Sequence, residues 1–361
     1  MQIFTDVRTL LLFLLTFTLI IAVHELGHYL TARLLGMKVL EFAFGFPPRL
    51  FAVRHAGIDY SVNAIPFGGF VRILGQDDFA VRQAGEGEPG SFTSKPWWAQ
   101  AIVLVAGVVM NALLALVVLT GSFLFGGPVA TGEVRIVEVK AGSPAEEAGI
   151  RKDDIVREVD GAPIEDSQEL VRYTRAHRGQ ILTIVLERGG QRVPPVRIEA
   201  RRRPPEGEGP LGIVLVDATA PMTGGLPQAF GHAWALTGDV VQQIAALPGQ
   251  LLGGAAEAPS DAQPQVGGPI EILRVTGEVS RFGFAAVLRL VGVLSINLAV
   301  LNIIPFPALD GGRLLFVLIG GIFRKRPSPQ VEAAVHAVGF VLLLGLLVAV
   351  SIADIRRLIG G

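Results

Sequence analysis

The feature that most constrains this chain is a series of long apolar stretches, of which the clearest, from Trp97 to Phe125, carries no charge. It opens with a pair of tryptophans, which favour the headgroup region of a bilayer, and has a strongly polar residue, Asn111, in its interior. A helix needs about 20 apolar residues to cross a hydrocarbon core that is roughly 30 Å thick. The stretch therefore predicts a membrane-spanning helix.

Three further apolar stretches have the same character. The first runs from Thr9 to Val23 and spans only if its helix continues toward Leu35, which places the ionisable residues 24–28 at membrane depth. The others run from residue 282 to 304 and from residue 331 to 355, approximately. Four spans predict a polytopic α-helical membrane protein with both termini on the same side.

Composition supports this class and narrows the chemistry. The chain is 50% hydrophobic and 17% charged, whereas a soluble domain carries about 25% charge. It has no cysteine, which excludes disulfides, thiol nucleophiles and thiolate metal sites and leaves His, Asp and Glu as metal ligands. A net charge of -1 gives no reason to expect a nucleic-acid partner. A secretory signal peptide is the alternative for the first stretch, but charged residues and further spans follow it, which favours a membrane helix.

Basic residues set the expected orientation, because basic loops tend to remain in the cytosol. They cluster after the first stretch and before the last, whereas the N-terminal tail has only Arg8; the clustered residues are Lys38, Arg49, Arg54, Arg72, Arg82, Lys95, Arg324, Lys325 and Arg326. Both termini and the segment between the second and third spans are therefore expected outside the cytosol. His24 lies about 22 Å beyond Thr9 at 1.5 Å per residue, so the ionisable cluster is expected toward the cytosolic end of its span.

The segment from Thr131 to about Asp217 has the composition of a small globular α+β domain. EVRIVEV, DDIVREVDG and ILTIVLERGG predict strands, and SPAEEAG and DSQELVRYTRA predict short helices. The string GSPAEEAGIRKDDIVREVDGAPI resembles the heart of a PDZ domain, which implies a groove that holds an extended peptide as an added strand. Residues expected to line this groove are Gly209, Leu211, Gly212 and Ile213. A domain that only blocks access is the alternative.

Between this domain and the third span, residues 226–252 show the apolar spacing of an amphipathic helix. Such a helix is expected either to lie at the membrane interface or to pack against the PDZ domain. The stretch AAEAPSDAQPQVGG that follows has the composition of a flexible linker.

The chemistry centres on the motif His24-Glu25-Leu26-Gly27-His28, which fits H-E-x-x-H. Residues at i and i+4 share one face of a helix, so both imidazoles can hold one Zn²⁺, with Glu25 beside them to take a proton from water. A chance match is the alternative. Against it stands the cost of a charge at the centre of a membrane, about 2.5 to 3.5 kcal/mol, because of which such residues are usually functional.

A catalytic zinc has three protein ligands and one open position, so a third ligand is expected at similar depth. Asp310 is the candidate. It follows the third apolar stretch in NLAVLNIIPFPALDGG, where Pro305 and Pro307 break the helix and the pair Gly311-Gly312 permits close backbone approach. A helix-ending turn at the membrane surface is the other interpretation of this segment.

Together these features resemble the site-2 protease family of intramembrane zinc metalloproteases, and specifically its bacterial regulator-of-sigma-E type. The resemblance rests on HELGH, on DYSVNAIPFGGFVRI, on the Asn, Pro and Leu-Asp-Gly series from residue 297 to 311, and on the inserted PDZ domain. It implies His24, His28 and Asp310 as zinc ligands and Glu25 as catalytic base. It further implies a multi-pass protein of the bacterial inner membrane whose substrates are membrane-embedded proteins: anti-sigma factors or remnant signal peptides, already trimmed by another protease.

Residues 60–73 alternate well enough to predict two short strands around a turn at residues 66–69. The resemblance suggests that they form a membrane-associated hairpin, whose edge pairs with the unwound substrate. Residues expected to contact the substrate are Gly68, Gly69, Phe70, Asn297, Asn302 and Pro305. For the two asparagines the expected role is to hold or polarise substrate carbonyls, and packing within the third helix is the alternative.

The predicted order is as follows: a first transmembrane helix (1–36), a cytosolic loop with the hairpin (37–96), a second transmembrane helix (97–126), the PDZ domain (127–217), an amphipathic helix and linker (218–281), a third transmembrane helix with the LDG motif (282–312), a cytosolic loop (313–330) and a fourth transmembrane helix with a tail (331–361). The other histidines, which are His55, His177, His232 and His336, are expected to be structural or solvent-facing. Two rival functions remain: a metal transporter, which would not need Glu25 or the PDZ insert, and a membrane-anchored PDZ adaptor, which would not need Asp310.

Overall fold

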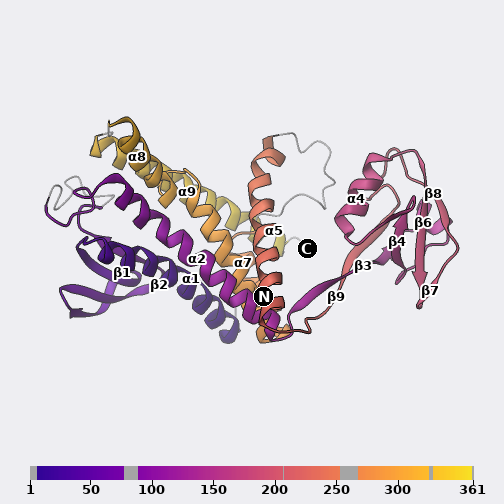
Figure 1. The fold of residues 1–361 in the computed structure, drawn as a ribbon, viewed down its shortest axis with the longest axis horizontal. Coiled ribbons are helices and arrows are strands. Elements are labelled where there is room, and N and C mark those ends of the chain that lie inside the picture. The colour runs from indigo at the N-terminus through magenta and orange to yellow at the C-terminus, as the bar shows by residue number, and fades with distance from the viewer. Residues whose placement is uncertain (1–5, 77–87, 206, 253–266, 325–327, 360–361) are drawn as a thin grey trace. The chain divides into compact units, whose positions relative to one another are not determined.

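The computed structural model describes residues 6–76, 88–205, 207–252, 267–324 and 328–359 (Figure 1). The chain divides into two compact units. Residues 1–125, 224–247 and 266–361 make the first, and residues 126–223 with 248–265 make the second. The first unit is mainly helical, and the second is built on a β-sheet.

Four long helices, α1 (Val7–Leu34), α2 (Trp97–Leu124), α7 (Phe284–Ile303) and α9 (Pro329–Ile359), dominate the first unit. Within the described ranges, Val7–Leu34, Trp97–Leu124, Phe284–Ile303 and Gln330–Arg357 are long and apolar enough to cross a membrane. The four predicted stretches therefore form four candidate membrane-spanning helices. On α9, Val341 and Leu346 are more than half exposed, as expected of a helix surrounded by lipid.

Helix α2 lies between α1 and α7 and contacts both (Figure 1). Small residues permit the close approach of these helices, as is common within membranes. A Cβ at Gly27 of α1 would lie 2.5 Å from the Ala106 carbonyl oxygen of α2. On the other side, a Cβ at Gly292 of α7 would lie 2.5 Å from Leu119 Cγ. These contacts fix which residues of α1 and α7 face α2.

After α7 the chain bends and starts a further helix, α8 (Asp310–Phe323). A loop was expected over residues 313–330. This expectation is wrong for residues 313–323, which are helical. The helix forms because the two prolines lie before its first residue, and the apolar run LLFVLI that follows has no helix breaker. Residues 325–327 lie outside the described part of the chain.

An antiparallel sheet of β1 (Val39–His55) and β2 (Ile58–Ile73) lies beside α1 (Figure 1). Both strands bend, so that Phe44 pairs with Val62 in one part of β2 and with Gly69 in another. The expected hairpin around residues 66–69 is wrong in its pairing, because both flanking segments pair with β1 rather than with each other. The first part of β1 supplies the extended partner for each of them.

Helix α5 (Leu226–Leu252) occupies the segment predicted to be an amphipathic helix, and α6 (Pro269–Val279) with the short helix η3 (Ser280–Phe282) leads into α7. On α5, Val240 packs against the apolar cluster that α2 and α7 share, and His232 lies 5.5 Å from Phe123 of α2, measured between ring centroids. Helix α5 therefore packs on the candidate membrane-spanning helices α2 and α7. The sequence had suggested the membrane interface or the PDZ domain as its place. The linker stretch lies largely outside the described residues.

The second unit is an antiparallel sheet of long and short strands with two helices. Its strands are β3 (Pro128–Val139), β4 (Ile155–Val159), β5 (Ala162–Pro163), β6 (Ile181–Arg188), β7 (Gln191–Arg192), β8 (Val196–Glu199) and β9 (Ile213–Pro221), and its helices are α3 (Pro144–Glu147) and α4 (Ser167–Ala176). The main strand order is β7-β6-β4-β3-β9, with β5 on β4 and β8 on β6. The strands and helices predicted from residues 133–188 all form. Alternate residues such as Leu182, Ile184 and Leu186 face a buried core.

Candidate metal centre

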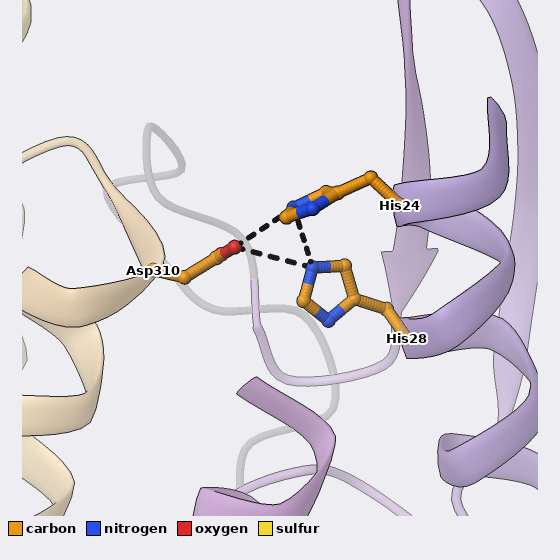
Figure 2. A group of neighbouring side chains, drawn as sticks. All are labelled: His24, His28 and Asp310. Carbon is orange, nitrogen blue, oxygen red and sulfur yellow. Dashed lines mark hydrogen bonds and ion pairs between the residues drawn. The ribbon is translucent and has the colours of Figure 1, made fainter. Parts of the chain in front are cut away.

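Helix α1 brings two imidazoles to one face. His24 and His28 are four residues apart, and their Nε2 atoms lie 3.1 Å from each other (Figure 2). Their side chains are only 7% and 9% exposed. The pair is therefore removed from bulk water although it consists of ionisable groups.

Asp310, the first residue of α8, completes a group of three. Its Oδ2 lies 2.9 Å from His24 Nε2 and 3.3 Å from His28 Nε2 (Figure 2). The glycine at position 311 allows Asp310 to lie here, because a Cβ on residue 311 would collide with the carbonyl oxygens of Ile303 and Ile304 at the end of α7. The structure thus brings together the three residues predicted as metal ligands, from segments that are 286 residues apart.

The three ligand atoms have the spacing of a metal site. With bonds of about 2.0 to 2.1 Å in tetrahedral geometry, ligand atoms lie roughly 3.3 Å apart. The observed separations of 2.9, 3.1 and 3.3 Å are close to that value. Two imidazoles and one carboxylate leave a fourth position open, which is the donor set of a catalytic zinc site.

Helix α2 forms the wall behind the two histidines. His28 Nδ1–H donates to the Val103 carbonyl at 2.8 Å, which directs Nε2 toward Asp310. Asn111 lies at the other ring, with its amide nitrogen 3.4 Å from His24 Nδ1. Between them is Gly107, where a Cβ would lie 2.6 Å from both His24 Cε1 and His28 Nε2.

Nothing in the sequence marks Val103 or Gly107 as part of the site, because their roles depend on the register of α2 against α1. Asn111 is different. It is one of two amide side chains in the second apolar stretch, with Gln100, and a polar side chain at membrane depth is a signal of function. That signal did not reveal which residue Asn111 contacts.

Glu25 connects the helix with the sheet. Its Oε2 accepts a hydrogen bond from Val71 N–H at 3.0 Å, and it lies within electrostatic reach of His24, His28 and Asp310. Val71 pairs with Phe42 of β1 on the other side of its strand. The carboxylate is therefore held between the histidine pair and the last part of β2.

The predicted substrate residues of the third span lie at different distances from this group. Asn302 is buried, with its amide nitrogen 3.4 Å from His24 Nε2, and so belongs to the same cluster. Pro305 lies in the bend that carries Asp310. Asn297 is half-buried on α7, five residues before Asn302 and hence about 140° around the helix. The structure thus does not bring Asn297 to the face that Asn302 shares.

The predicted substrate residues of the sheet lie in β2. A Cβ at Gly69 would lie 2.7 Å from the Ala43 carbonyl oxygen, so this position holds the two strands close together. Gly68 has a φ of 91° and lies against the ring of Phe46, which also stacks on Phe70 with ring centroids 6.3 Å apart. These contacts order the bend of β2 next to α1.

The other histidines stand apart from the group of three. His55 is exposed on β1, and His177 stacks on Tyr173 with ring centroids 4.2 Å apart. His232 contacts Phe123, as described above. His336 of α9 is buried, and its Nδ1 accepts a hydrogen bond from Ala308 N–H at 2.9 Å. Its role is therefore structural, in support of the bend before Asp310.

In the second unit, a cavity of about 180 Å³ lies between α4 and the start of β9. It is lined by Leu170, Val171, Thr174, Arg175, Gly207, Glu208, Gly209, Pro210, Leu211, Ile213 and Leu215. Three of the four residues predicted for the PDZ groove are among them. The fourth, Gly212, has a φ of 72° and lies against Ser143 instead.

Comparison with known proteins bears on this site. The sequence profile of peptidase family M50 matches residues 12–346. A Clostridium perfringens protein named as a zinc metalloprotease is 34% identical over 347 residues, which cover 95% of this chain and 97% of that protein. The zinc metalloprotease RasP of Oceanobacillus iheyensis is 28% identical, covering 97% of this chain and 99% of its own length. Among solved structures, the PDZ domain of an SdrC-like protein of Listeria monocytogenes covers 25% of this chain and 93% of its own, at 26% identity and a TM-score of 0.21.

The matching profile extends over nearly the whole chain, and the relatives align along almost all of their own length. The resemblance to the site-2 proteases that the motifs suggested is therefore confirmed. The chain belongs to peptidase family M50, the site-2 protease family of zinc metalloproteases.

Proposed function

We propose that this protein is an endopeptidase that cleaves the membrane-spanning segments of membrane-anchored proteins. The observation that carries the proposal is the convergence of His24, His28 and Asp310 next to helices that are long enough to cross a membrane. Such a donor set, with one position open, is what a hydrolytic zinc site requires. A site built on these helices acts on peptide bonds at membrane depth.

His24, His28 and Asp310 hold the metal ion, and Glu25 moves the protons. When bound, Zn²⁺ supplies Lewis acidity, which polarises a peptide carbonyl and makes water acidic near neutral pH. Glu25 accepts a proton from the attacking water and then gives a proton to the leaving amine nitrogen. The hydrogen bond from Val71 N–H orients its carboxylate beside the ligands.

The last part of β2 presents the substrate. A helix has to become extended before one of its peptide bonds can be hydrolysed, and unwinding frees backbone groups that need partners within a membrane. A strand edge supplies them by strand addition. Gly68, Gly69 and Phe70 lie next to Val71 on this edge, and Asn302, beside His24 Nε2, donates to a substrate carbonyl oxygen. Asn297 and Pro305 bind the substrate segment further from the ligands.

The substrates are anti-sigma factors or remnant signal peptides, which another protease has already trimmed. The protein resides in the bacterial inner membrane with both termini outside the cytosol and the active site toward the cytosolic side, as the distribution of basic residues supports. The second unit is a PDZ domain inserted outside the cytosol, and the cavity along α4 and β9 supports a role in screening substrates.

The substitution Glu25→Gln tests the proposed chemistry. It keeps the size of the side chain but removes the base, so we expect zinc content to be unchanged and cleavage of a single-span membrane reporter to be abolished. Loss of general base catalysis costs about 10² to 10⁴ in rate. The measurement is the rate of reporter cleavage by purified protein in lipid vesicles, with the metal content determined in parallel.

Glu138→Gln is the matched control, because it makes the same change at an exposed glutamate of β3. It should leave cleavage and zinc content as they are. Undiminished cleavage by Glu25→Gln would contradict the assignment of the base. Zinc uptake into vesicles without reporter cleavage would favour a transporter, and peptide binding without cleavage by the wild-type protein would favour an adaptor.

A further inference from the structure

One face of α2 serves both metal-binding histidines. Val103, Gly107 and Asn111 follow each other at intervals of four residues and therefore lie along one side of the helix. The first contacts His28, the second faces both rings and the third contacts His24. Each ring thus has a partner on α2 at its Nδ1 atom, while its Nε2 atom faces Asp310.

The proton on each ring decides whether its other nitrogen can bind a metal. A neutral imidazole carries one N–H, so Nε2 is available as a ligand only when the proton is on Nδ1. For His28 this arrangement is present, since Nδ1–H donates to the Val103 carbonyl at 2.8 Å. His24 needs an acceptor at its own Nδ1 for the same reason.

Asn111 is the group at that place. It is fully buried, and its side-chain amide lies 3.4 Å from His24 Nδ1 through Nδ2, while its Oδ1 has no hydrogen-bond partner among the described residues. The two ends of an amide have nearly the same shape, and their assignment follows from the hydrogen-bond network. With Oδ1 toward the ring, the unpaired acceptor meets the N–H that a ligating His24 must carry.

The position of Asn111 is itself fixed from the opposite side. The Ser295 hydroxyl of α7 donates to the Asn111 main-chain carbonyl at 2.9 Å, and both residues are fully buried. This bond joins α7 to α2 at the level of the metal ligands. The contact with α7 therefore helps to fix the backbone of Asn111, and with it the position of the side-chain amide beside the His24 ring.

We propose that Asn111 is a positioning residue, whose Oδ1 accepts the hydrogen bond from His24 Nδ1 and thereby sets the ring tautomer in which Nε2 binds zinc. This inference rests on the zinc site of the proposed function. It goes beyond that site in assigning a role to a residue of α2, which contributes no metal ligand.

Zinc affinity, measured by competition with a chelator on the full-length protein in detergent, tests the proposal. Partners of ligating histidines contribute about 10- to 100-fold to metal affinity. We therefore expect Asn111→Leu to weaken zinc binding by that factor and Asn111→Asp, whose carboxylate also accepts, to restore binding to within about threefold of the wild type. Gln100→Leu is the control, because it removes another buried amide of α2, one that donates to the Lys95 carbonyl.

Equal zinc affinity in Asn111→Leu and the wild type would overturn the proposal, and so would an Asn111→Asp variant as weak as Asn111→Leu. If Asn111→Leu fails to fold, ¹⁵N NMR of the imidazoles in the zinc-loaded wild type decides: a protonated His24 Nδ1 supports the proposal, and an unprotonated one refutes it. A wild-type protein that binds no zinc would instead refute the proposed function, so the two failures are distinguishable.

Discussion

At the scale of single residues, the metal centre depends on the lack of a side chain at Gly107. Gly107 faces the rings of His24 and His28, and a methyl group there would lie 2.6 Å from His28 Nε2 and 2.8 Å from His24 Nε2. These are the atoms proposed to bind the metal, so the methyl would compete with the ion for the same space. Neither ring can retreat freely, because Val103 and Asn111 hold their other nitrogens.

Gly107→Ala should therefore weaken zinc binding by about 100-fold or more, beyond what the loss of a hydrogen-bond partner costs. Metal content after dialysis against a zinc buffer measures this. Gly121→Ala on the same helix is the control, since a Cβ there would lie 3.5 Å from Leu288 Cδ1, an ordinary contact. Normal zinc content in Gly107→Ala would show that the rings have more freedom than the structure indicates.

A buried ion pair makes the second unit sensitive to pH. Burial raises the pKa of Asp154, but hydrogen bonds from Arg188 and from Arg151 N–H outweigh this and hold the pKa below its ordinary value. A carboxylate with a lowered pKa contributes stability above its unfolded pKa, which is about 3.9, and this contribution is lost as the pH falls through the folded value.

Asp154→Asn should accordingly lower the free energy of unfolding of this unit by about 2 kcal/mol at pH 7, and the difference from the wild type should shrink below about pH 4. Denaturant unfolding of the full-length protein, followed by proteolysis within residues 126–223, measures it. Glu158→Gln is the control, because Glu158 pairs with an exposed arginine, Arg192, at 3.4 Å and contributes little. A difference that does not change with pH would mean that charge is not the cause.

At the scale of helices and strands, α9 supports the bend that carries Asp310. Ala308 has a φ of 75°, which is unfavourable for a residue with a side chain and persists only where neighbours enforce it. His336 accepts the Ala308 N–H, and Gly339 allows Pro307 to lie directly against α9. The position of the third ligand therefore depends on a helix that contributes none.

His336→Ala should leave the Ala308 N–H without its partner and free the bend. We expect this to weaken zinc binding about tenfold, the lower end of the range for supporting groups. Chelator competition is again the measurement. Leu342→Ala shortens an exposed side chain of the same helix and should leave the affinity unchanged. If both variants bind zinc like the wild type, the bend holds Asp310 without help from α9.

The elements also show which parts of this fold a sequence can predict. The length of the apolar stretches predicted the four candidate spans, and the i, i+4 rule predicted the histidine pair, because both signals are local. The pairing of β2 was not predictable from residues 60–73, since its partner is the first part of β1. Helix α8 was missed because two prolines and a glycine pair beside Asp310 favour a loop, although the prolines precede the helix.

Among site residues the same division holds. Asp310 was predictable because a catalytic zinc needs a third ligand, and this carboxylate follows an apolar stretch at a break made by two prolines and a glycine pair. Val103 contributes a main-chain carbonyl, which every residue has, and Gly107 contributes only space. Their roles arise from how α1 and α2 are aligned, and that alignment is a property of packing rather than of either stretch alone.

At the scale of the whole molecule, the site requires the membrane-spanning helices to hold a defined orientation. The ligands come from α1 and from α8, so the chain between them has to return to the same membrane depth. The proposed orientation puts the β1–β2 sheet and the end of α8 in the cytosol and the second unit outside it. The distribution of positive charge supports the proposed orientation, because the segment with the β1–β2 sheet and the segment after α8 carry most of the basic loop residues.

Single cysteines can test this orientation cleanly, because the chain has none of its own. In intact cells, a membrane-impermeant maleimide should label Lys152→Cys, in the exposed loop before β4, but should label His55→Cys and Arg324→Cys only after permeabilisation. All three positions are exposed, so a failure to react reports the side of the membrane rather than burial. Labelling of His55→Cys in intact cells would place the sheet, and with it the edge of β2 proposed to receive substrates, outside the cytosol. Substrates would then have to reach the histidines from the opposite side, and the expected cytosolic location of the active site would be wrong even if its chemistry were right.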